Sequence, residues 1–207
     1  MINEQLVNLS NDFFQNSLDA SPTSAIMRGH KAYFDKIEEL TEEQFEIDSK
    51  NVDDYLKRLR EIELNSLSNR EKVTYGMLEF ALGSNKDSLL DKGWEFSAGV
   101  AGFTGFLIDY NQQMFIPDME SADLLLKRLE LYKRLFNQIA YVQKTGLENN
   151  RVATERNLLR TIDQLENYLD TTLENDPLLL VNFSPDISDG DISNWKEKAK
   201  VIIESNI

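Results

Sequence analysis

The sequence has no cysteine and only one histidine, His30, among its 207 residues. The absence of cysteine excludes disulfides, thiolate catalysis and cysteine-ligated zinc. With one histidine, a zinc site would depend on carboxylates, which suit zinc poorly. A Ser-His-acid triad is unsupported as well, because no serine lies in a Gly-x-Ser-x-Gly turn. His30 follows Gly29 and is interpreted as a turn residue with local hydrogen bonds.

Long apolar runs are also missing, since no stretch approaches the ~20 apolar residues that span a bilayer. The first residues, Met-Ile-Asn-Glu-Gln-Leu, have neither the basic n-region nor the apolar h-region of a secretory signal. We therefore expect a cytoplasmic protein without a membrane partner. A mature secreted or periplasmic domain that has lost its signal is the alternative.

Positive charge is scarce, because 22 lysines and arginines stand against 36 aspartates and glutamates, a net charge of −14. Such a field repels phosphate backbones and anionic lipids, so nucleic acid is not expected as a partner. The charge is uneven: residues 35–63 carry 11 acidic and 5 basic side chains, whereas residues 119–160 carry 5 acidic and 8 basic. These charges lie either on solvated helix faces or on two regions that face each other.

Helical periodicity is what the sequence has in abundance. At this length and with 41% hydrophobic residues, the chain is expected to fold as one helical domain, residues 1–207. The predicted fold is all-α, a multi-helix array with segments at 3–20, 22–29, 41–63, 69–82, 119–145, 152–173 and from 188 onward.

Capping residues mark several of the helix ends. Thr41 and Ser68 precede helices, and Glu71 completes a capping box with Ser68. Ser188 or Asp189 is expected to cap the last helix. Gly83 is predicted to end the helix that it follows, in which Val73, Met77, Phe80 and Ala81 share one face.

An antiparallel helical hairpin is predicted for residues 119–173, because only a short connection separates two periodic segments. The first segment is expected to end at Gly146. Four residues are predicted to lie in the core of the hairpin: Leu129, Phe136, Leu158 and Leu165.

Residues 84–118 break the helical pattern. This stretch and its border hold five of the nine glycines, together with many aromatic side chains that require burial. We interpret it as a packed, irregular segment that crosses the domain. Its aromatic side chains are expected to pack the two helical halves together, and contact of Trp94 or Phe103 with a substrate is the alternative role.

No cluster carries a complete chemical motif. The carboxylate pairs Glu38-Glu39, Glu42-Glu43 and Asp53-Asp54 are expected on solvated faces. Gly99, Gly102 and Gly105 do not have the spacing of a phosphate-binding loop, and no lysine follows them. Asp186, Asp189, Asp191 and Gly190 do not keep the register of an EF-hand and instead indicate a helix start rich in acids. The sequence therefore assigns no catalytic, cofactor-binding or metal-binding residue.

The serial order of several short segments carries a family resemblance. These are Ser21-Pro22-Thr23-Ser24-Ala25 with Gly29-His30, Leu67-Ser68-Asn69-Arg70-Glu71 leading to Tyr75, and Ser121 to Leu129 followed by Thr145-Gly146 and Arg151 to Leu165. In this order the chain resembles the first portion of the bacterial domain-of-unknown-function family 885, large helical proteins regarded as zinc metallopeptidases. The chain departs from the family pattern at Val152-Ala153, where Pro-Arg is usual.

The resemblance implies an N-terminal, non-catalytic helical portion of a zinc-dependent peptidase or hydrolase that forms part of the wall of a substrate cleft. The family's His-Glu-x-x-Pro-Gly-His-like helix has no counterpart in this chain, so zinc and the catalytic residues are implied only for a downstream portion. That downstream portion is the expected partner. The alternative is a stand-alone acidic helical protein that acts as a binding module or scaffold.

Overall fold

The computed structural model describes residues 3–96 and 110–207 of the chain. Helix accounts for 76% of the structure, which confirms the all-α fold. The chain forms two compact units: residues 1–20 and 40–93 make unit 1, and residues 21–39 and 94–207 make unit 2. The expectation of a single domain stays a prediction, and each unit is described by itself.

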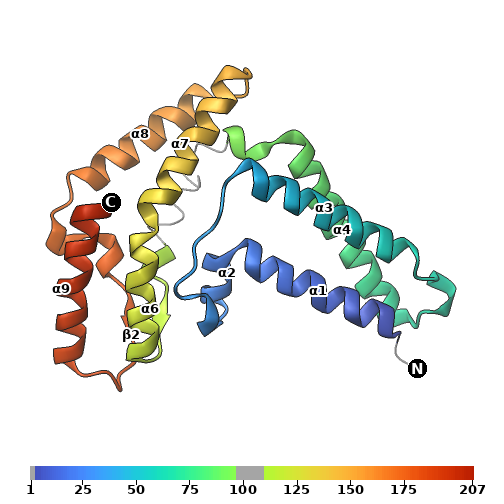
Figure 1. The fold of residues 1–207 in the computed structure, drawn as a ribbon, viewed down its shortest axis with the longest axis horizontal. Helices are drawn as coiled ribbons and strands as arrows, with labels where there is room; N and C mark the ends of the chain where they lie inside the picture. Colours follow the sequence, from blue (N-terminus) through green and yellow to red (C-terminus); the bar gives the residue numbers. More distant parts are fainter. Residues whose placement is uncertain (1–2, 97–109) are drawn as a thin grey trace. The chain divides into compact units, whose positions relative to one another are not determined.

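Unit 1 is built from three long helices (Figure 1). Thr41 caps the second of them by accepting a hydrogen bond from Gln44 N, and Ser68 and Glu71 form the predicted capping box on the third. The helices are α1 (Glu4–Ala20), α3 (Glu42–Arg60) and α4 (Asn69–Asp91), with a short 3-10 turn at Leu64–Ser66. Their shared core consists of Leu6, Leu9, Val52, Leu56, Leu59, Ile62, Leu67, Tyr75, Leu78 and Leu82.

Helix α4 differs from its prediction in two respects. It continues past Gly83 to Asp91, because its end is made instead by Lys92 in the left-handed region, at φ 50°. Its buried face is also different: Val73, Met77 and Phe80 are 62%, 68% and 77% exposed. The helix is apolar on two sides, so periodicity alone could not say which side is buried.

Unit 2 contains the remaining elements, except that the first residue of the turn at Gly93–Phe96 belongs to unit 1. They are α2 (Pro22–Met27), a 3-10 turn at Lys31–Tyr33, a 3-10 turn at Gly93–Phe96, β1 (Phe115–Ile116), α6 (Met119–Glu130), α7 (Tyr132–Glu148), α8 (Glu155–Leu169), 3-10 turns at Leu173–Asn175 and Pro177–Leu179, β2 (Asn182–Phe183) and α9 (Asp189–Asn206). Within the described ranges the only sheet is the parallel pair of β1 and β2, in which Phe115 faces Asn182.

Helices α6 and α9 form the centre of unit 2. Trp195 of α9 is 1% exposed and donates its indole N–H to the carbonyl oxygen of Ala122 in α6, at 2.8 Å. Ser188 caps α9 as predicted, by accepting from Asp191 N. The buried side chains of this core include Leu125, Leu129, Tyr132, Leu135, Ile139, Leu178, Leu179, Ala199 and Ile203.

The predicted hairpin of residues 119–173 needs correction. Its first segment is two helices, since the chain turns at Leu131 between α6 and α7, and α7 continues past Gly146 to Glu148. Leu129 is buried as predicted, but Phe136 is only half-buried. Leu158 and Leu165 are 39% and 38% exposed, and α8 buries no side chain at all. Helix α8 is therefore packed only through partly buried side chains such as Thr161, Gln164 and Tyr168, and its apolar residues are left largely open.

The predicted irregular segment is likewise only partly correct. Residues 84–91 belong to α4. Phe103, Phe106 and the glycines of residues 99–105 lie outside the described residues.

Candidate functional site

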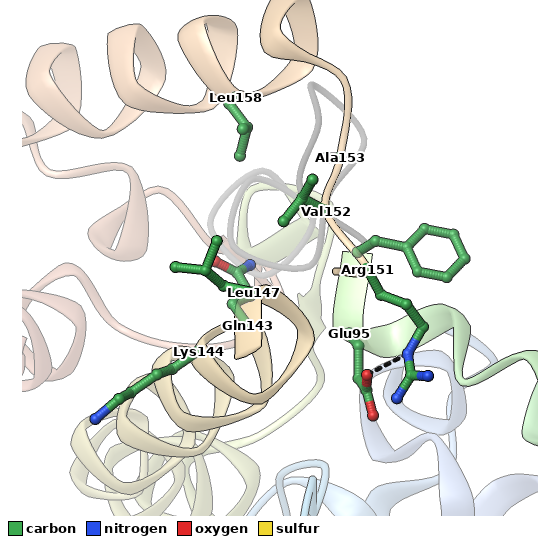
Figure 2. A pocket seen from close by; sticks show the side chains of 9 residues that line it. Glu95, Gln143, Lys144, Leu147, Arg151, Val152, Ala153 and Leu158 are labelled. Atoms are coloured by element: carbon green, nitrogen blue, oxygen red, sulfur yellow. Dashed lines mark hydrogen bonds and ion pairs between the residues drawn. The ribbon is translucent and has the colours of Figure 1, made fainter. Parts of the chain in front are cut away.

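A cavity of about 310 Å³ lies beside the C-terminal half of α7 and the start of α8 (Figure 2). It is open to solvent on one side, and its walls come from α7, from α8, from the connection between them and from the turn at Gly93–Phe96. The lining residues are Glu95, Phe96, Gln143, Lys144, Leu147, Arg151, Val152, Ala153 and Leu158.

Gly146 brings the wall of this cavity together. Gly146 O accepts a hydrogen bond from Arg151 N at 2.8 Å, which folds the connection back onto α7. A Cβ at position 146 would lie 2.3 Å from the carbonyl oxygen of Glu95 and 2.7 Å from that of Arg151. Only glycine permits such an approach of backbone to helix, so this residue fixes the distance between α7 and the turn at residues 93–96.

An ion pair closes one side of the cavity. Arg151 Nε donates to Glu95 Oε2 at 2.5 Å, and the Glu95 side chain is 4% exposed while that of Arg151 is 35% exposed. The hydrogen bond to Glu95 raises the pKa of Arg151. The pair neutralises a buried carboxylate and holds the Arg151 backbone in place, so neither group is free to act as an acid or a base.

The rest of the lining is mostly apolar. Figure 2 shows Leu147, Val152 and Leu158 around the cavity, whereas Lys144 extends its amino group away from it. Such a lining suits an apolar side chain of a peptide or another ligand, and its volume lies at the lower end of the usual range for ligand sites, ~300–1,000 Å³.

A second candidate is a buried polar cluster around Arg128 of α6. Arg128 is fully buried and donates to Thr23 Oγ1 at 2.5 Å and to the carbonyl oxygen of Lys36. Its guanidinium lies 3.6 Å from Glu38, whose carboxylate also accepts from the backbone and hydroxyl of Thr23 at 2.9 Å each. This cluster attaches residues 21–39 to α6.

Unit 2 also holds three buried polar side-chain atoms that lack a partner among the described residues. Arg128 Nε, Tyr132 Oη and Asn111 Oδ1 are buried, and none of them has a hydrogen-bond partner within the described ranges. Burial raises the pKa of Tyr132, and it also raises that of Tyr168, which donates to Asp176 at 3.0 Å. Since buried water typically serves such atoms and Arg128 joins α6 to residues 21–39, the cluster is interpreted as structural.

The structure places the sequence candidates apart from one another. His30 begins the turn at Lys31–Tyr33, donates its backbone N–H to Ala25 O at 3.0 Å and packs edge-to-face on Tyr33, which confirms its interpretation as a turn residue. Asp189 and Asp191 lie in the first turn of α9, as predicted. Trp94 is half-buried and does not line the cavity.

The prediction of solvated carboxylate pairs is wrong for Glu38 and Glu39, which precede α3. Glu38 is 5% exposed, and Glu39 accepts from Arg134 and Gln138 of α7. Their partners belong to the basic region 119–160, so part of the charge asymmetry does reflect contact. Asp53 pairs with Lys86 at 2.6 Å and Asp54 with Arg58 at 3.6 Å, both near the surface.

In the part of the chain that the structure describes, no three histidine, cysteine, aspartate or glutamate side chains gather in a group that could hold a metal. Only one histidine exists to contribute a nitrogen ligand. None of the described helices is long and apolar enough to cross a membrane.

Comparison with known proteins gives one match. The family model for bacterial proteins of unknown function (DUF885) matches residues 22–207, which is all but the first 21 residues. No curated protein and no solved structure matches the chain. The match confirms the family predicted from the order of short segments in the sequence.

Proposed function

The chain belongs to the DUF885 family of bacterial proteins of unknown function, and on that premise we propose that it is the N-terminal, non-catalytic helical portion of a zinc-dependent peptidase or related hydrolase. In this proposal the cavity beside α7 and α8 is part of one wall of the substrate cleft. The partner is the downstream catalytic portion of the same protein, and zinc is bound there. Neither nucleic acid nor a membrane takes part, and a cytoplasmic location belongs to the same proposal.

The observation that supports this proposal is the chemistry of the cavity. Its apolar residues, Phe96, Leu147, Val152 and Leu158, offer burial to one side chain of a peptide. Gln143 adds an amide that can donate to a peptide carbonyl and accept from a peptide N–H. The wall is held by Gly146 and by the Glu95–Arg151 pair, so the cavity keeps its shape before a ligand binds.

This chain's residues would bind and orient a substrate without taking part in bond cleavage. The one buried carboxylate at the cavity, that of Glu95, is occupied by Arg151. We therefore expect residues 1–207 alone to hydrolyse no peptide. Zinc-dependent hydrolysis by the isolated chain would contradict the proposal.

A matched pair of valine substitutions tests the cleft wall in the whole protein. Val152 lines the cavity and is 53% exposed, whereas Val201 on α9 is 67% exposed and lies outside it. Val152→Trp should narrow the cavity and raise KM about tenfold with little change in kcat, because it removes binding shared by ground state and transition state. Val201→Trp should leave both constants unchanged. Equal kinetics for the two variants would show that the cavity does not contact substrate.

The second candidate function is a stand-alone acidic helical binding or scaffold protein. The exposed apolar side chains of α8 favour it, since an open apolar face commonly marks an interaction surface. The reading frame distinguishes the two candidates. A His-Glu-x-x-x-x-His-like helix encoded in frame after Ile207 favours the peptidase portion, and a stop codon there favours the binding protein.

A further inference from the structure

The C-terminal two-thirds of α8 carry an apolar stripe that nothing in the described chain covers. Its members follow one another at steps of three, three and four residues, so they lie on one side of the helix. They are Leu159, Ile162, Leu165 and Leu169, with exposed fractions of 55%, 49%, 38% and 75%. No residue of α8 is fully buried, and the helix contacts the rest of unit 2 through side chains such as Tyr168, which donates to Asp176 at 3.0 Å.

An acidic rim runs beside this stripe. Asp163, Glu166 and Asp170 each come one residue after an apolar member, and Arg160 follows Leu159 in the same way, so the edge carries three acidic side chains and one basic side chain. All three are exposed, and none forms an ion pair with any lysine or arginine that the structure describes. Residues 161–170 hold no basic side chain. A helix with this pattern presents an apolar seam and, beyond Arg160, a negative edge.

We propose that this face of α8 binds an amphipathic helix whose apolar seam is flanked by lysine or arginine. Apolar contact along the stripe would supply the binding energy, and the basic flank of the incoming helix would pair with Asp163, Glu166 and Asp170. The stripe adjoins the cavity, since Leu158, one turn before Ile162 on the same side of α8, lines it. A helix docked on the stripe would therefore build a second wall beside the cavity.

The charge of the face argues against other occupants. In a pair formed by two copies of this chain, two acidic rims would meet across the interface, and each copy carries a net charge of −14. The same rim disfavours an anionic lipid surface. The identity of the docked helix as part of the downstream catalytic portion rests on the proposed function, whereas its basic amphipathic character rests on α8 alone.

Two synthetic helical peptides test the proposal directly. Both are about three heptads long with leucine at positions a and d; one carries lysine and the other glutamate at positions e and g. Binding of each labelled peptide to the chain is measured by fluorescence anisotropy at several salt concentrations. We expect the lysine peptide to bind at least about tenfold more tightly than the glutamate peptide, with a difference that shrinks as salt rises.

Matched variants separate the α8 face from the general negative charge of the protein. The double variant Asp163→Lys, Glu166→Lys should reverse the preference between the two peptides. The double variant Glu61→Lys, Glu79→Lys makes the same change in net charge at exposed positions of unit 1 and should keep the preference. Ile162→Gln should weaken binding of the lysine peptide about tenfold, whereas Ile47→Gln, at an exposed isoleucine of α3, should not.

Each contrary outcome overturns the proposal. Equal binding of the two peptides, no binding of either, or an equal effect of the two charge-reversal variants would each exclude a basic helix on this face. A dimer in analytical ultracentrifugation that Ile162→Gln dissociates would identify a second copy as the occupant instead. None of these measurements needs zinc or hydrolysis. A negative result for peptide binding to α8 therefore leaves the test of the cleft wall by Val152→Trp unaffected, and a negative result for Val152→Trp leaves the test of α8 unaffected.

Discussion

Gly146 is the position at which α7 contacts the turn at residues 93–96. The sequence predicts that the helix ends at this glycine, but α7 continues through it to Glu148. Helical glycine is normally unfavourable by roughly 0.5–1 kcal/mol relative to alanine, so its presence two residues before the end of α7 needs a reason. The reason is steric, because the carbonyl oxygens of Glu95 and Arg151 occupy the space of a Cβ.

Gly146→Ala should therefore destabilise the protein, by about 1–3 kcal/mol, since backbone atoms must move to admit the methyl group. Gly83→Ala is the matched control. Gly83 lies inside α4 with nothing within 4 Å of its Cβ position, so alanine there should stabilise by about 0.5–1 kcal/mol. Urea denaturation of the two variants measures both changes, and a neutral Gly146→Ala would show that the contact is loose.

The carboxylate of Glu71 makes stability depend on acid pH. It accepts from the backbone N–H of Asn3 at 2.7 Å and from the hydroxyl and backbone of Ser68 at 2.6 and 2.9 Å. The hydrogen bond from the Ser68 hydroxyl, followed by that from Asn3, lowers the pKa of Glu71 from 4.5 to about 2.

Because this pKa is lower in the folded state, the stabilisation is complete above the unfolded value and is lost as the pH falls from 4.5 to about 2. Glu71→Gln should lower stability at neutral pH and flatten the pH dependence in that window. Glu79→Gln, at an exposed position of the same helix, should leave the dependence unchanged. Denaturant titrations at intervals between pH 6 and about pH 2 measure this, and parallel curves for Glu71→Gln and the unsubstituted protein would refute it.

At the scale of the helix, α6 and α8 have similar apolar periodicity in sequence but differ in how far their apolar side chains are buried. Leu129 of α6 is fully buried, whereas Leu165 of α8 is 38% exposed. Leu129→Ala should cost about 2–5 kcal/mol through the lost contacts and the cavity left behind. Leu165→Ala should cost less than about 1 kcal/mol in the isolated chain. A denaturant titration that gave Leu165→Ala the larger loss would mean that α8 packs into the core.

Helix starts were the elements best predicted from sequence. Thr41, Ser68 and Ser188 cap helices as expected, because a cap is a local interaction between a side chain and the next turn. Burial was predicted less well, since it depends on what another segment supplies. The stripe Val73, Met77 and Phe80 has sound helical periodicity yet faces outward, because α4 has a second apolar side, through Tyr75, Leu78 and Leu82, that meets the core of unit 1.

The candidate site was mostly out of reach of sequence reasoning. The cavity depends on the approach of residues 95–96 to α7 and on the path of the connection before α8, neither of which any periodicity encodes. The buried Arg128 did leave a signal. It lies three residues after Leu125 and four before Tyr132, so a charged residue stands in the middle of an apolar stripe. Such a residue needs an acidic partner from elsewhere in the chain, and Glu38 is that partner.

At the scale of the whole molecule, each unit is assembled from two separated stretches of chain. Thr23 is joined to Arg128 across 105 residues of sequence, and Lys36 is joined to the same arginine across 92. Contacts so distant along the chain must close long loops, which is expected to slow folding.

During synthesis on the ribosome, Glu38 therefore emerges long before the arginine that neutralises it. Residues 21–39 must wait, without their buried partners, until α6 has been translated. A chaperone that covers residues 21–39 would shorten the interval in which the new chain can aggregate. Truncating the chain at one position cannot give either unit alone, because each unit consists of two separated stretches. A chain that begins at residue 94 would lack Glu38 and would bury Arg128 without its counter-charge.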